Sequence, residues 1–287
     1  MKAEIKEDQV TLENREWINY RYLGQGQPLL LIHGNMSSSV FWDHTLEAMA
    51  DSYTGIAPDL RGFGQSSYQG KIESIEDFAE DMILFIEKLS LKNIHLAGWS
   101  LGGAVALTLV LKRPDLFKSL GLFACAGLGR EKKGTFWQLP AIRDVMGADW
   151  PRLPEEKSPL LGYGVEMLWE TTMYHIQRPN PEDYEKYLAG SLAQRNRKEV
   201  ILALRDFSVK EEDWEKITLP VLRIQGREDR VLGLPRHIHR TAHCRLYIFE
   251  DCGHFIMNDQ FDQFIQTYKE FLRKGIKDDQ NFNHQGN

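Results

Sequence analysis

Short runs of apolar residues bounded by glycine or proline recur along the chain, and longer segments with a different periodicity lie between them. Continuous apolar runs of about four to eight residues are typical of parallel strands that are buried on both faces of a sheet. We interpret as such strands residues 28–32, 93–97, 119–123, 221–224 and 246–249. Residues 9–22 favour an antiparallel hairpin near the start of the chain.

Helical periodicity fills the segments between these runs. Residues 75–89 place apolar side chains at every third or fourth position, and Ser74 is a suitable N-cap for that helix. Residues 101–111 begin a second helix directly after a strand, and Pro114 ends it. Strands that alternate with helices in this way predict an α/β fold with a doubly wound, mostly parallel sheet.

Residues 127–207 interrupt this alternation. Glycine and proline are frequent in the first part of the segment, and helical patterns without a convincing strand follow at residues 165–174, 182–192 and 198–207. We therefore expect a helical cap, 127–207, inserted into a core that is formed by residues 1–126 and 208–276. The polar end of the chain, 277–287, is expected to be disordered.

The composition fits a globular protein with one sizeable core. The chain has 287 residues, of which 42% are hydrophobic and 26% charged, and α/β folds often reach this length as a single core with an insertion. The net charge of −6 comes without a basic stripe, so a nucleic-acid partner is not expected. The apolar runs are too short to span a bilayer, and the first eight residues have no apolar stretch, so we expect no secretory signal. Three cysteines, an odd count, favour reduced thiols, so we expect a cytoplasmic protein of undetermined oligomeric state.

A candidate nucleophile stands at the junction between a strand and a helix. Gly98-Trp99-Ser100-Leu101-Gly102 has the G-x-S-x-G pattern of a nucleophile elbow. The two glycines let strand and helix approach each other, and the strained turn exposes the serine hydroxyl. The helix that begins at Leu101 also directs its free N–H groups at the site. Ser100 is therefore the candidate nucleophile.

A candidate acid and a candidate base follow later strands, in the order Ser…Asp…His that nucleophile elbows of this kind use. The strand at 221–224 leads to Glu228 and Asp229, of which we favour Asp229. His254 lies on a loop just after the last strand. His254 would take the Ser100 proton and return it to the leaving group, while Asp229 holds the imidazole in the required tautomer.

An oxyanion on a tetrahedral intermediate needs two preorganised donors. The first is expected to be the backbone N–H of Leu101, the residue after the nucleophile. The loop after the first long buried strand supplies the second, which we assign to the Asn35 N–H, with the Met36 N–H as the alternative. We interpret His33 in the same loop as a side chain that bonds turn backbone, and not as the catalytic base.

Three histidines near the last strand, His237, His239 and His243, stand close to Cys244, and the spacing of the last two histidines would put both on one helix face. No carboxylate or second cysteine completes a persuasive ligand set. We therefore interpret them as surface residues and expect neither a metal nor a cofactor.

Aromatic residues are frequent in the cap and near the loop that carries His33 and Asn35, which we call the oxyanion loop. They either line an apolar substrate pocket or form the core of the cap itself, and the sequence leaves both possibilities open. These residues are Phe41, Trp42, Phe136, Trp137, Trp150, Tyr163, Trp169 and Tyr174.

With these elements in place, the chain resembles the α/β-hydrolase superfamily over essentially its whole length, cap included. Residues 59–66 (DLRGFGQS) are similar to the family's Asp-x-x-Gly-x-Gly-x-Ser turn, and residues 255–260 resemble the helix after the family's histidine. Residues 33–39 with Trp42 resemble small intracellular polyhydroxybutyrate depolymerases, and the elbow resembles that of pimeloyl-ester esterases. Haloalkane dehalogenases share the asparagine after His-Gly but carry an aspartate where this chain has Ser100.

Together these features predict a serine hydrolase that cleaves carboxylic esters through an acyl-enzyme on Ser100. The substrate is expected to be a small or oligomeric ester with a short or medium, largely apolar acyl group, and hydroxyalkanoate esters are one specific version. A carbon–carbon bond hydrolase or an amidase with the same triad is the alternative among enzymes. A non-catalytic ligand receptor on this fold is the alternative of another class; such proteins often lack a triad member, whereas this chain has all three.

Overall fold

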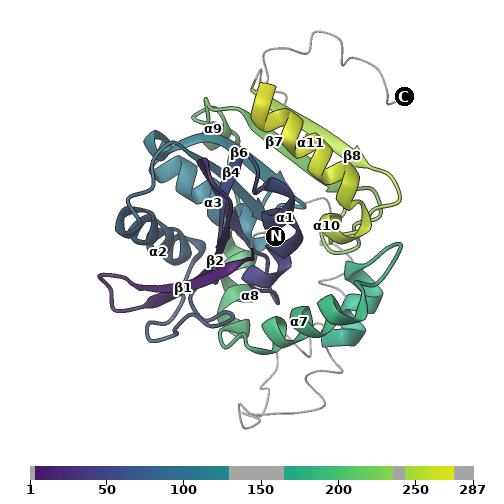
Figure 1. The fold of residues 1–287 in the computed structure, drawn as a ribbon, viewed down its shortest axis with the longest axis horizontal. Coiled ribbons are helices and arrows are strands. Elements are labelled where there is room, and N and C mark those ends of the chain that lie inside the picture. The colour runs from purple at the N-terminus through teal and green to yellow at the C-terminus, as the bar shows by residue number, and fades with distance from the viewer. Residues whose placement is uncertain (1–3, 129–164, 235–242, 275–287) are drawn as a thin grey trace.

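The computed structural model of the protein describes residues 4–128, 165–234 and 243–274. Its centre is an eight-stranded sheet with the strand order β1-β2-β4-β3-β5-β6-β7-β8 (Figure 1). The strands are β1 (Lys6–Thr11), β2 (Trp17–Leu23), β3 (Gln27–Ile32), β4 (Tyr53–Pro58), β5 (Ile94–Trp99), β6 (Phe117–Phe123), β7 (Val221–Gly226) and β8 (Cys244–Phe249).

The pairing of these strands confirms the predicted fold class. β1 and β2 form the expected antiparallel hairpin, and β2 pairs antiparallel with β4. Every pair from β4 through β3 to β8 is parallel. The five strands predicted from apolar runs are all present, and β4 is an additional strand that the runs did not indicate.

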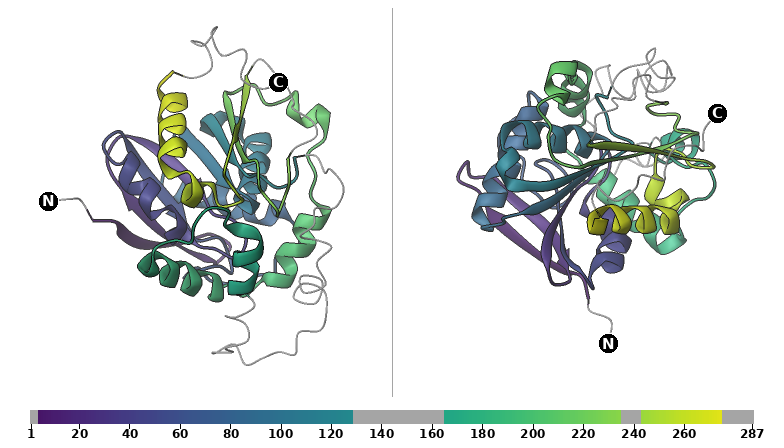
Figure 2. Two further views of the ribbon diagram at one scale, coloured as in Figure 1. Left: turned by 90° about the vertical axis from the view of Figure 1, so that its right-hand side faces the viewer. Right: turned by 90° about the horizontal axis from the view of Figure 1, so that it is seen from above.

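Helices cover both faces of the sheet, which is the doubly wound arrangement (Figure 2). α2 and α3 pack on one face, and α1 and α11 pack on the other. Consecutive side chains of β3 alternate between the two cores: Leu30 packs with α2 and α3, and Leu31 packs with α1 and α11. These helices are α1 (Asp43–Met49), α2 (Ile75–Lys88), α3 (Leu101–Lys112) and α11 (Phe261–Lys274).

From residue 165 onwards, the described part of the chain between β6 and β7 consists of helices joined by turns and irregular segments, without a strand. Two of the three predicted cap helices, 182–192 and 198–207, correspond to α7 and α8 within one residue, and the third contains a π-helical turn. The elements are η3 (Trp169–Met173), α7 (Pro181–Leu192), α8 (Arg197–Asp206) and α9 (Glu211–Trp214). Residues 129–164 and 277–287 lie outside the described residues, so the predicted cap limits and tail stay predictions.

Three short elements complete the described structure: η1 (Ser39–Trp42), η2 (Pro114–Leu116) and α10 (Ile256–Asp259). α7 contacts η1, and α8 contacts α2, so the described part of the cap rests on the core at two places. None of the helices in the described ranges is long and apolar enough to cross a bilayer.

Candidate active site

Ser100 occupies a sharp turn between the last residue of β5 and the first residue of α3. Its φ of +56° lies in the left-handed region, which is costly for a residue with a side chain. Glycines make the turn possible. A Cβ on Gly98 would lie 2.0 Å from the Gly102 carbonyl oxygen, and a Cβ on Gly102 would lie 2.1 Å from the Ile32 carbonyl oxygen. Because neither position tolerates a side chain, the spacing of the elbow motif follows from this packing.

His254 and Asp229 come from the loops that follow β8 and β7. His254 Nδ1 lies 2.9 Å from Asp229 Oδ2, and both side chains are buried. Asp229 Oδ2 also accepts a hydrogen bond from Gln225 Nε2 at 2.6 Å. The other oxygen, Oδ1, accepts the N–H groups of Val231 and Leu232 at 2.8 and 2.9 Å. With a carboxylate facing Nδ1, that nitrogen carries the proton of the neutral ring, and His254 Nε2 is left to accept one.

The loop that carries His254 is fastened to the elbow. Trp99 Nε1 donates a hydrogen bond to the His254 carbonyl oxygen at 2.9 Å, and the centroids of the two rings lie 5.5 Å apart. Trp99 directly precedes Ser100, so this bond holds the histidine loop beside the candidate nucleophile. The structure thus pairs His254 with Asp229 and holds the His254 loop against Trp99, the residue next to Ser100.

The loop after β3 borders the elbow at Gly34, where a Cβ would lie 3.2 Å from the Cβ of the candidate nucleophile. Within the described residues, no hydrogen bond takes up the backbone N–H of Asn35 or that of Leu101. The Met36 N–H, in contrast, donates to Gln194 Oε1 of the cap at 3.0 Å. The Asn35 and Leu101 N–H groups therefore remain available as the expected donor pair, and the Met36 alternative loses support.

His33 bonds the backbone of its own turn, which is the role that the sequence analysis preferred. Its Nε2 accepts the Leu60 N–H at 3.0 Å, so Nδ1 carries the proton and bonds the Gly34 carbonyl oxygen at 2.8 Å. Burial lowers the pKa of His33, which keeps the ring neutral. Both ring nitrogens are engaged, so this histidine is not placed to act as a base.

Aromatic rings of core and cap meet beside the triad residues. The Phe41 ring stacks on Trp99 with a centroid distance of 5.8 Å, and on Tyr187 of α7 at 4.2 Å. Phe255, the neighbour of His254, stacks on Trp99 at 5.0 Å. The surroundings of the site are therefore strongly apolar.

The structure describes four of the aromatic residues named in the sequence analysis, and it leaves the choice between pocket and cap core open. Phe41 contacts Trp169 edge to face, and Tyr174 lies near Phe255, so these three belong to the cluster beside the site. Trp42 instead packs on Phe123 in the sheet core. The remaining four, Phe136, Trp137, Trp150 and Tyr163, lie outside the described residues.

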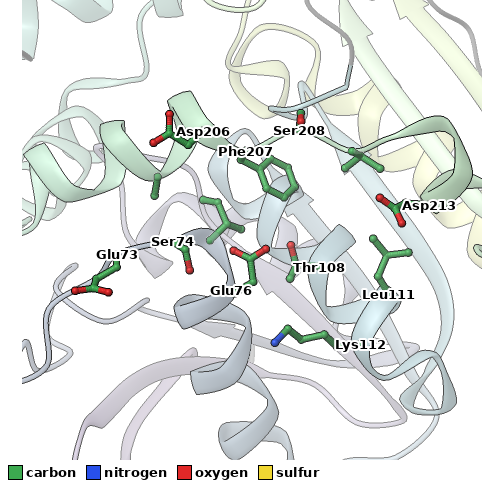
Figure 3. A pocket seen from close by; sticks show the side chains of 13 residues that line it. Glu73, Ser74, Glu76, Thr108, Leu111, Lys112, Asp206, Phe207, Ser208 and Asp213 are labelled. Carbon is green, nitrogen blue, oxygen red and sulfur yellow. The ribbon is translucent and has the colours of Figure 1, made fainter.

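A separate groove of about 320 Å³ lies between the start of α2, the end of α3 and the segment after α8 (Figure 3). Thr108 in its wall is eight residues along α3 from Ser100, which is roughly 12 Å at 1.5 Å per residue. Half of its eight polar lining residues are acidic: Glu73, Glu76, Asp206 and Asp213. No histidine is among the described residues that line it, so the groove has no counterpart of the His254 imidazole.

Glu228 and His243, two other candidates of the sequence analysis, take part in hydrogen bonds that hold segments of backbone together. The Glu228 carboxylate accepts the Cys252 N–H at 2.9 Å and so stabilises the loop before His254. The His243 carbonyl oxygen accepts the Val221 N–H at 2.7 Å, at the start of β8. His237 and His239 lie outside the described residues. In the described part of the chain, no group of three or more histidine, cysteine or acidic side chains is arranged to hold a metal ion.

Two side chains that contact the site were missed by the sequence analysis. Gln225 supports Asp229, and its signal was a polar residue at the carboxyl end of a buried strand. Gln194 contacts the oxyanion loop from the cap, and its local sequence carries no signal because its partners lie far away in the chain.

The fold and the site define a doubly wound α/β protein in which a strand–serine–helix turn stands beside a buried histidine–aspartate pair. The model of the alpha/beta hydrolase family matches residues 29–267. The chain belongs to this family.

Individual relatives are similar over most of the chain. An uncharacterised protein of Mycobacterium tuberculosis (strain H37Rv) is 30% identical over 266 residues, which cover 88% of this chain and 77% of that protein. The pimeloyl-[acyl-carrier protein] methyl ester esterase of Vibrio cholerae is 26% identical over 267 residues, covering 88% and 96%. The 2-hydroxymuconate semialdehyde hydrolase of Pseudomonas sp. (strain CF600) is 24% identical over 266 residues, covering 87% and 88%. A solved structure of a bacterial membrane phospholipase A is similar with a TM-score of 0.78 at 26% identity, covering 96% of this chain and 87% of that one.

Proposed function

We propose that the protein is a serine hydrolase that cleaves carboxylic esters through an acyl-enzyme on Ser100. The observation that carries the proposal is that a left-handed serine lies next to the loop of a buried His254–Asp229 pair, near two backbone N–H groups that have no hydrogen-bond partner among the described residues. These are the nucleophile, the base with its orienting acid, and the oxyanion donors that acyl transfer requires.

The proposed reaction has two steps. Ser100 Oγ attacks the ester carbonyl carbon while its proton passes to His254 Nε2, and the N–H groups of Asn35 and Leu101 bind the oxyanion that forms. The imidazolium, stabilised by Asp229, gives the proton to the departing alkoxide as the C–O bond breaks. Water then attacks the acyl-enzyme, passes a proton to His254, and the carboxylic acid leaves as Ser100 regains its proton.

The proposed acyl group is short or medium and largely apolar. The aromatic rings of Phe41, Trp99 and Phe255 beside the site support an apolar group. The pimeloyl-ester relative also supports an ester substrate. Esters of hydroxyalkanoic acids, small or oligomeric, are the narrower version that the resemblance of residues 33–39 suggests.

A carbon–carbon bond hydrolase is the second candidate, because the 2-hydroxymuconate semialdehyde hydrolase relative favours it and the same serine–histidine–aspartate set would serve. An amidase needs the same residues but has no relative among those described above. A non-catalytic receptor is disfavoured because the serine, the histidine and the aspartate are all retained and lie close together.

A panel of p-nitrophenyl esters of increasing acyl length, extended by oligomers of 3-hydroxybutyrate and by 2-hydroxymuconate semialdehyde, tests the proposal. We expect ester turnover with a burst of nitrophenol equal to the enzyme present. Ser100→Ala should lower kcat by on the order of 10⁴-fold or more, and a fluorophosphonate should label Ser100. Labelling at another serine, or turnover of the semialdehyde alone, would reject the ester proposal.

A further inference from the structure

The turn between α7 and α8 carries a buried glutamine, Gln194, which is 1% exposed. Its Oε1 accepts the Met36 N–H at 3.0 Å. Its Nε2 donates to Asn35 Oδ1 at 2.8 Å and to Asn196 Oδ1 at 3.1 Å. One side-chain amide of the cap therefore holds two consecutive residues of the oxyanion loop, and this orientation satisfies its acceptor and its donor together.

A second cap residue completes this contact. The Ser191 hydroxyl donates to the Met36 carbonyl oxygen, so both backbone polar groups of Met36 are bound by the cap. Met36 has a φ of +53°, a left-handed conformation that a non-glycine residue keeps only when its surroundings enforce it. The backbone of Met36 is thus held in this conformation by residues of the cap.

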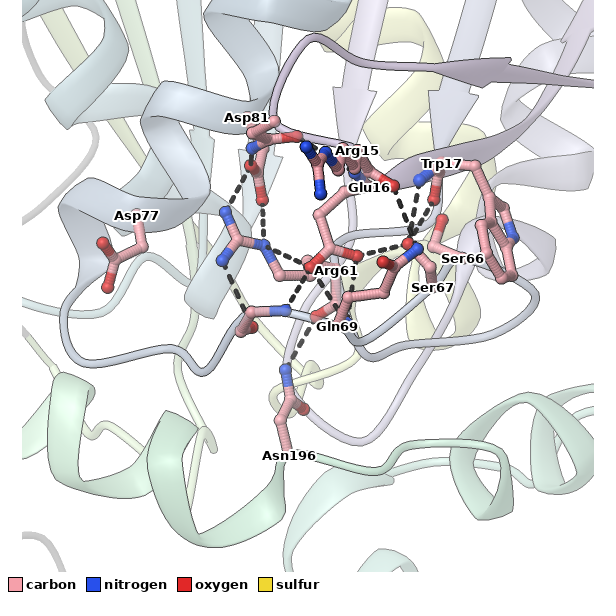
Figure 4. Close-up of polar contacts among 12 residues, drawn as sticks. Arg15, Glu16, Trp17, Arg61, Ser66, Ser67, Gln69, Asp77, Asp81 and Asn196 are labelled. Atoms are coloured by element: carbon pink, nitrogen blue, oxygen red, sulfur yellow. Dashed lines mark hydrogen bonds and ion pairs between the residues drawn. The ribbon is translucent and has the colours of Figure 1, made fainter.

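The turn between α7 and α8 is itself hydrogen-bonded to the backbone of the core. Asn196, fully buried, donates from Nδ2 to the Arg61 carbonyl oxygen at 2.7 Å, and the Arg195 N–H donates to the Gly62 carbonyl oxygen at 2.8 Å. Figure 4 shows Asn196 reaching up to Arg61, whose guanidinium is held by the buried Asp81 carboxylate at 2.7 Å. An ion pair buried at this depth anchors the backbone to which the cap turn is bonded.

We propose that Gln194 is a positioning residue that sets the direction of the Asn35 N–H toward the oxyanion. The inference rests on the proposed function, because it assigns Gln194 to the hole that the acyl-transfer reaction uses. Gln194 takes up the Met36 N–H and the Asn35 side-chain oxygen, while the Asn35 N–H has no hydrogen-bond partner among the described residues and is the donor that we assign to the oxyanion. Because oxyanion donors act only when preorganised, loss of the hydrogen bonds from Gln194 to Met36 and Asn35 should weaken transition-state binding more than substrate binding.

Three variants test this role. Gln194→Met keeps the length of the side chain but removes its amide, and Ser191→Ala removes the bond to the Met36 carbonyl. Asn180→Ala is the matched control: Asn180 caps the other end of α7 by accepting the Asp183 N–H at 3.0 Å, and it does not touch the oxyanion loop. Each enzyme is titrated for active sites with a fluorophosphonate, so that kcat refers to folded enzyme only.

We expect Gln194→Met to lower kcat by about 10- to 100-fold with KM within about threefold, since misplacing one oxyanion donor costs less than removing it. A trifluoromethyl ketone, which forms an oxyanion on the serine, should bind more weakly by the same factor as kcat/KM falls. Ser191→Ala should lower kcat by about three- to tenfold, and Asn180→Ala should leave kcat within about twofold. Proportional losses of kcat/KM and ketone binding would support a positioning role. Loss of a residue with only a structural role would leave both quantities unchanged when they are expressed per titrated active site.

The inference is overturned if Gln194→Met and Ser191→Ala match Asn180→Ala in kcat and in ketone binding, while the wild-type enzyme turns over esters. A fall confined to KM also overturns it. If Gln194→Met does not fold, the result for Ser191→Ala decides by the same criteria. If the wild-type enzyme hydrolyses none of the esters, the proposed function fails, and the inference falls with it.

Discussion

At the scale of single residues, Glu228 and Asp229 are neighbours in the chain whose carboxylates bind different groups. Glu228 accepts a backbone N–H of the loop before His254, whereas Asp229 faces His254 Nδ1 at 2.9 Å. We expect Asp229→Asn to lower kcat by about 10³- to 10⁴-fold, because an amide favours the wrong imidazole tautomer. Glu228→Gln keeps an acceptor oxygen and should change kcat by less than about tenfold. Steady-state kinetics on one p-nitrophenyl ester measures both, and a larger loss at Glu228 would reverse the assignment.

A second residue-scale prediction concerns His95, a buried histidine of β5 whose nitrogens lie 2.8 Å from Ser119 Oγ and 2.9 Å from Gln27 Oε1. Burial, and then the charge of Lys118, lower the pKa of His95 from 6.5 to about 4. In the unfolded chain the ring takes up its proton near pH 6.5, so between pH 7 and pH 4 the unfolded state binds more protons than the folded state. The free energy of unfolding should therefore fall as the pH drops through this window.

The contribution of His95 between pH 7 and pH 5 should be about 1–2 kcal/mol. Urea unfolding of the wild type and of His95→Gln at pH 7, 6 and 5 measures it, because the other titrating groups are common to both proteins. The variant should lose less stability on acidification by that amount. Parallel pH profiles for the two proteins would contradict the prediction.

The sequence was informative where a candidate site residue lies shortly after a strand. Ser100, Asp229 and His254 each stand within a few residues of a strand end, so local pattern and chain order were enough to select them. Gln194 could not be selected in this way. Its partners Met36 and Asn35 lie 158 and 159 residues away, and only the packing of the cap on the core joins them.

At the scale of elements, β5 could be predicted from its local sequence, whereas β4 could not. β5 is an apolar run that leads into the elbow, and α3 after it ends before Pro114, so both were predicted. β4 reads YTGIAP, where threonine, glycine and proline break the apolar run. It is nevertheless a strand, because it pairs with β3 on one side and β2 on the other, and pairing of this kind leaves no local pattern.

An element-scale prediction concerns Asp259, at the end of α10, which fastens the cap to the histidine loop. Its Oδ2 accepts the Gly253 N–H at 2.8 Å and the His175 N–H at 3.2 Å, and its Oδ1 accepts the Ile176 N–H at 3.3 Å. Asp259→Ala removes an acceptor shared by three N–H groups, so we expect a loss of about 2–4 kcal/mol in the free energy of unfolding. Activity should fall as well, since Gly253 directly precedes His254. Urea unfolding and kcat measure the two effects.

The control for this variant is Asp262→Ala, which removes an exposed carboxylate from the first turn of α11. There we expect a change below about 1 kcal/mol, the usual effect of one charge at a helix N-terminus. Equal destabilisation by the two variants would show that Asp259 does not act through the three N–H groups.

At the scale of the whole molecule, the parallel sheet explains why Ser100, Asp229 and His254, the residues of the proposed triad, come from loops at the same edge of the sheet. β5, β7 and β8 run in the same direction, so the loops after their carboxyl ends meet at one edge of the sheet. The cap reaches the same edge, where the Phe255 N–H donates to the Met173 carbonyl oxygen at 3.2 Å. The direction of the strands followed from the alternation of apolar runs and helices in the sequence. The packing of the cap on the core could not be predicted in this way. It depends on contacts between segments that are far apart in the chain, and such contacts leave no periodic pattern in the sequence.

The last prediction concerns what the whole molecule needs in order to act. In the proposed reaction, His254 moves the proton, Asp229 stabilises the imidazolium, and backbone N–H groups bind the oxyanion, so no step calls for a cation. We therefore expect kcat/KM for esters to be unchanged after dialysis against excess EDTA, and unchanged again when zinc is returned. Loss of activity with EDTA and recovery with zinc would instead require a metal-activated water as the nucleophile. It would then direct attention to His237, His239 and His243, and Ser100→Ala would in that case retain zinc-dependent turnover.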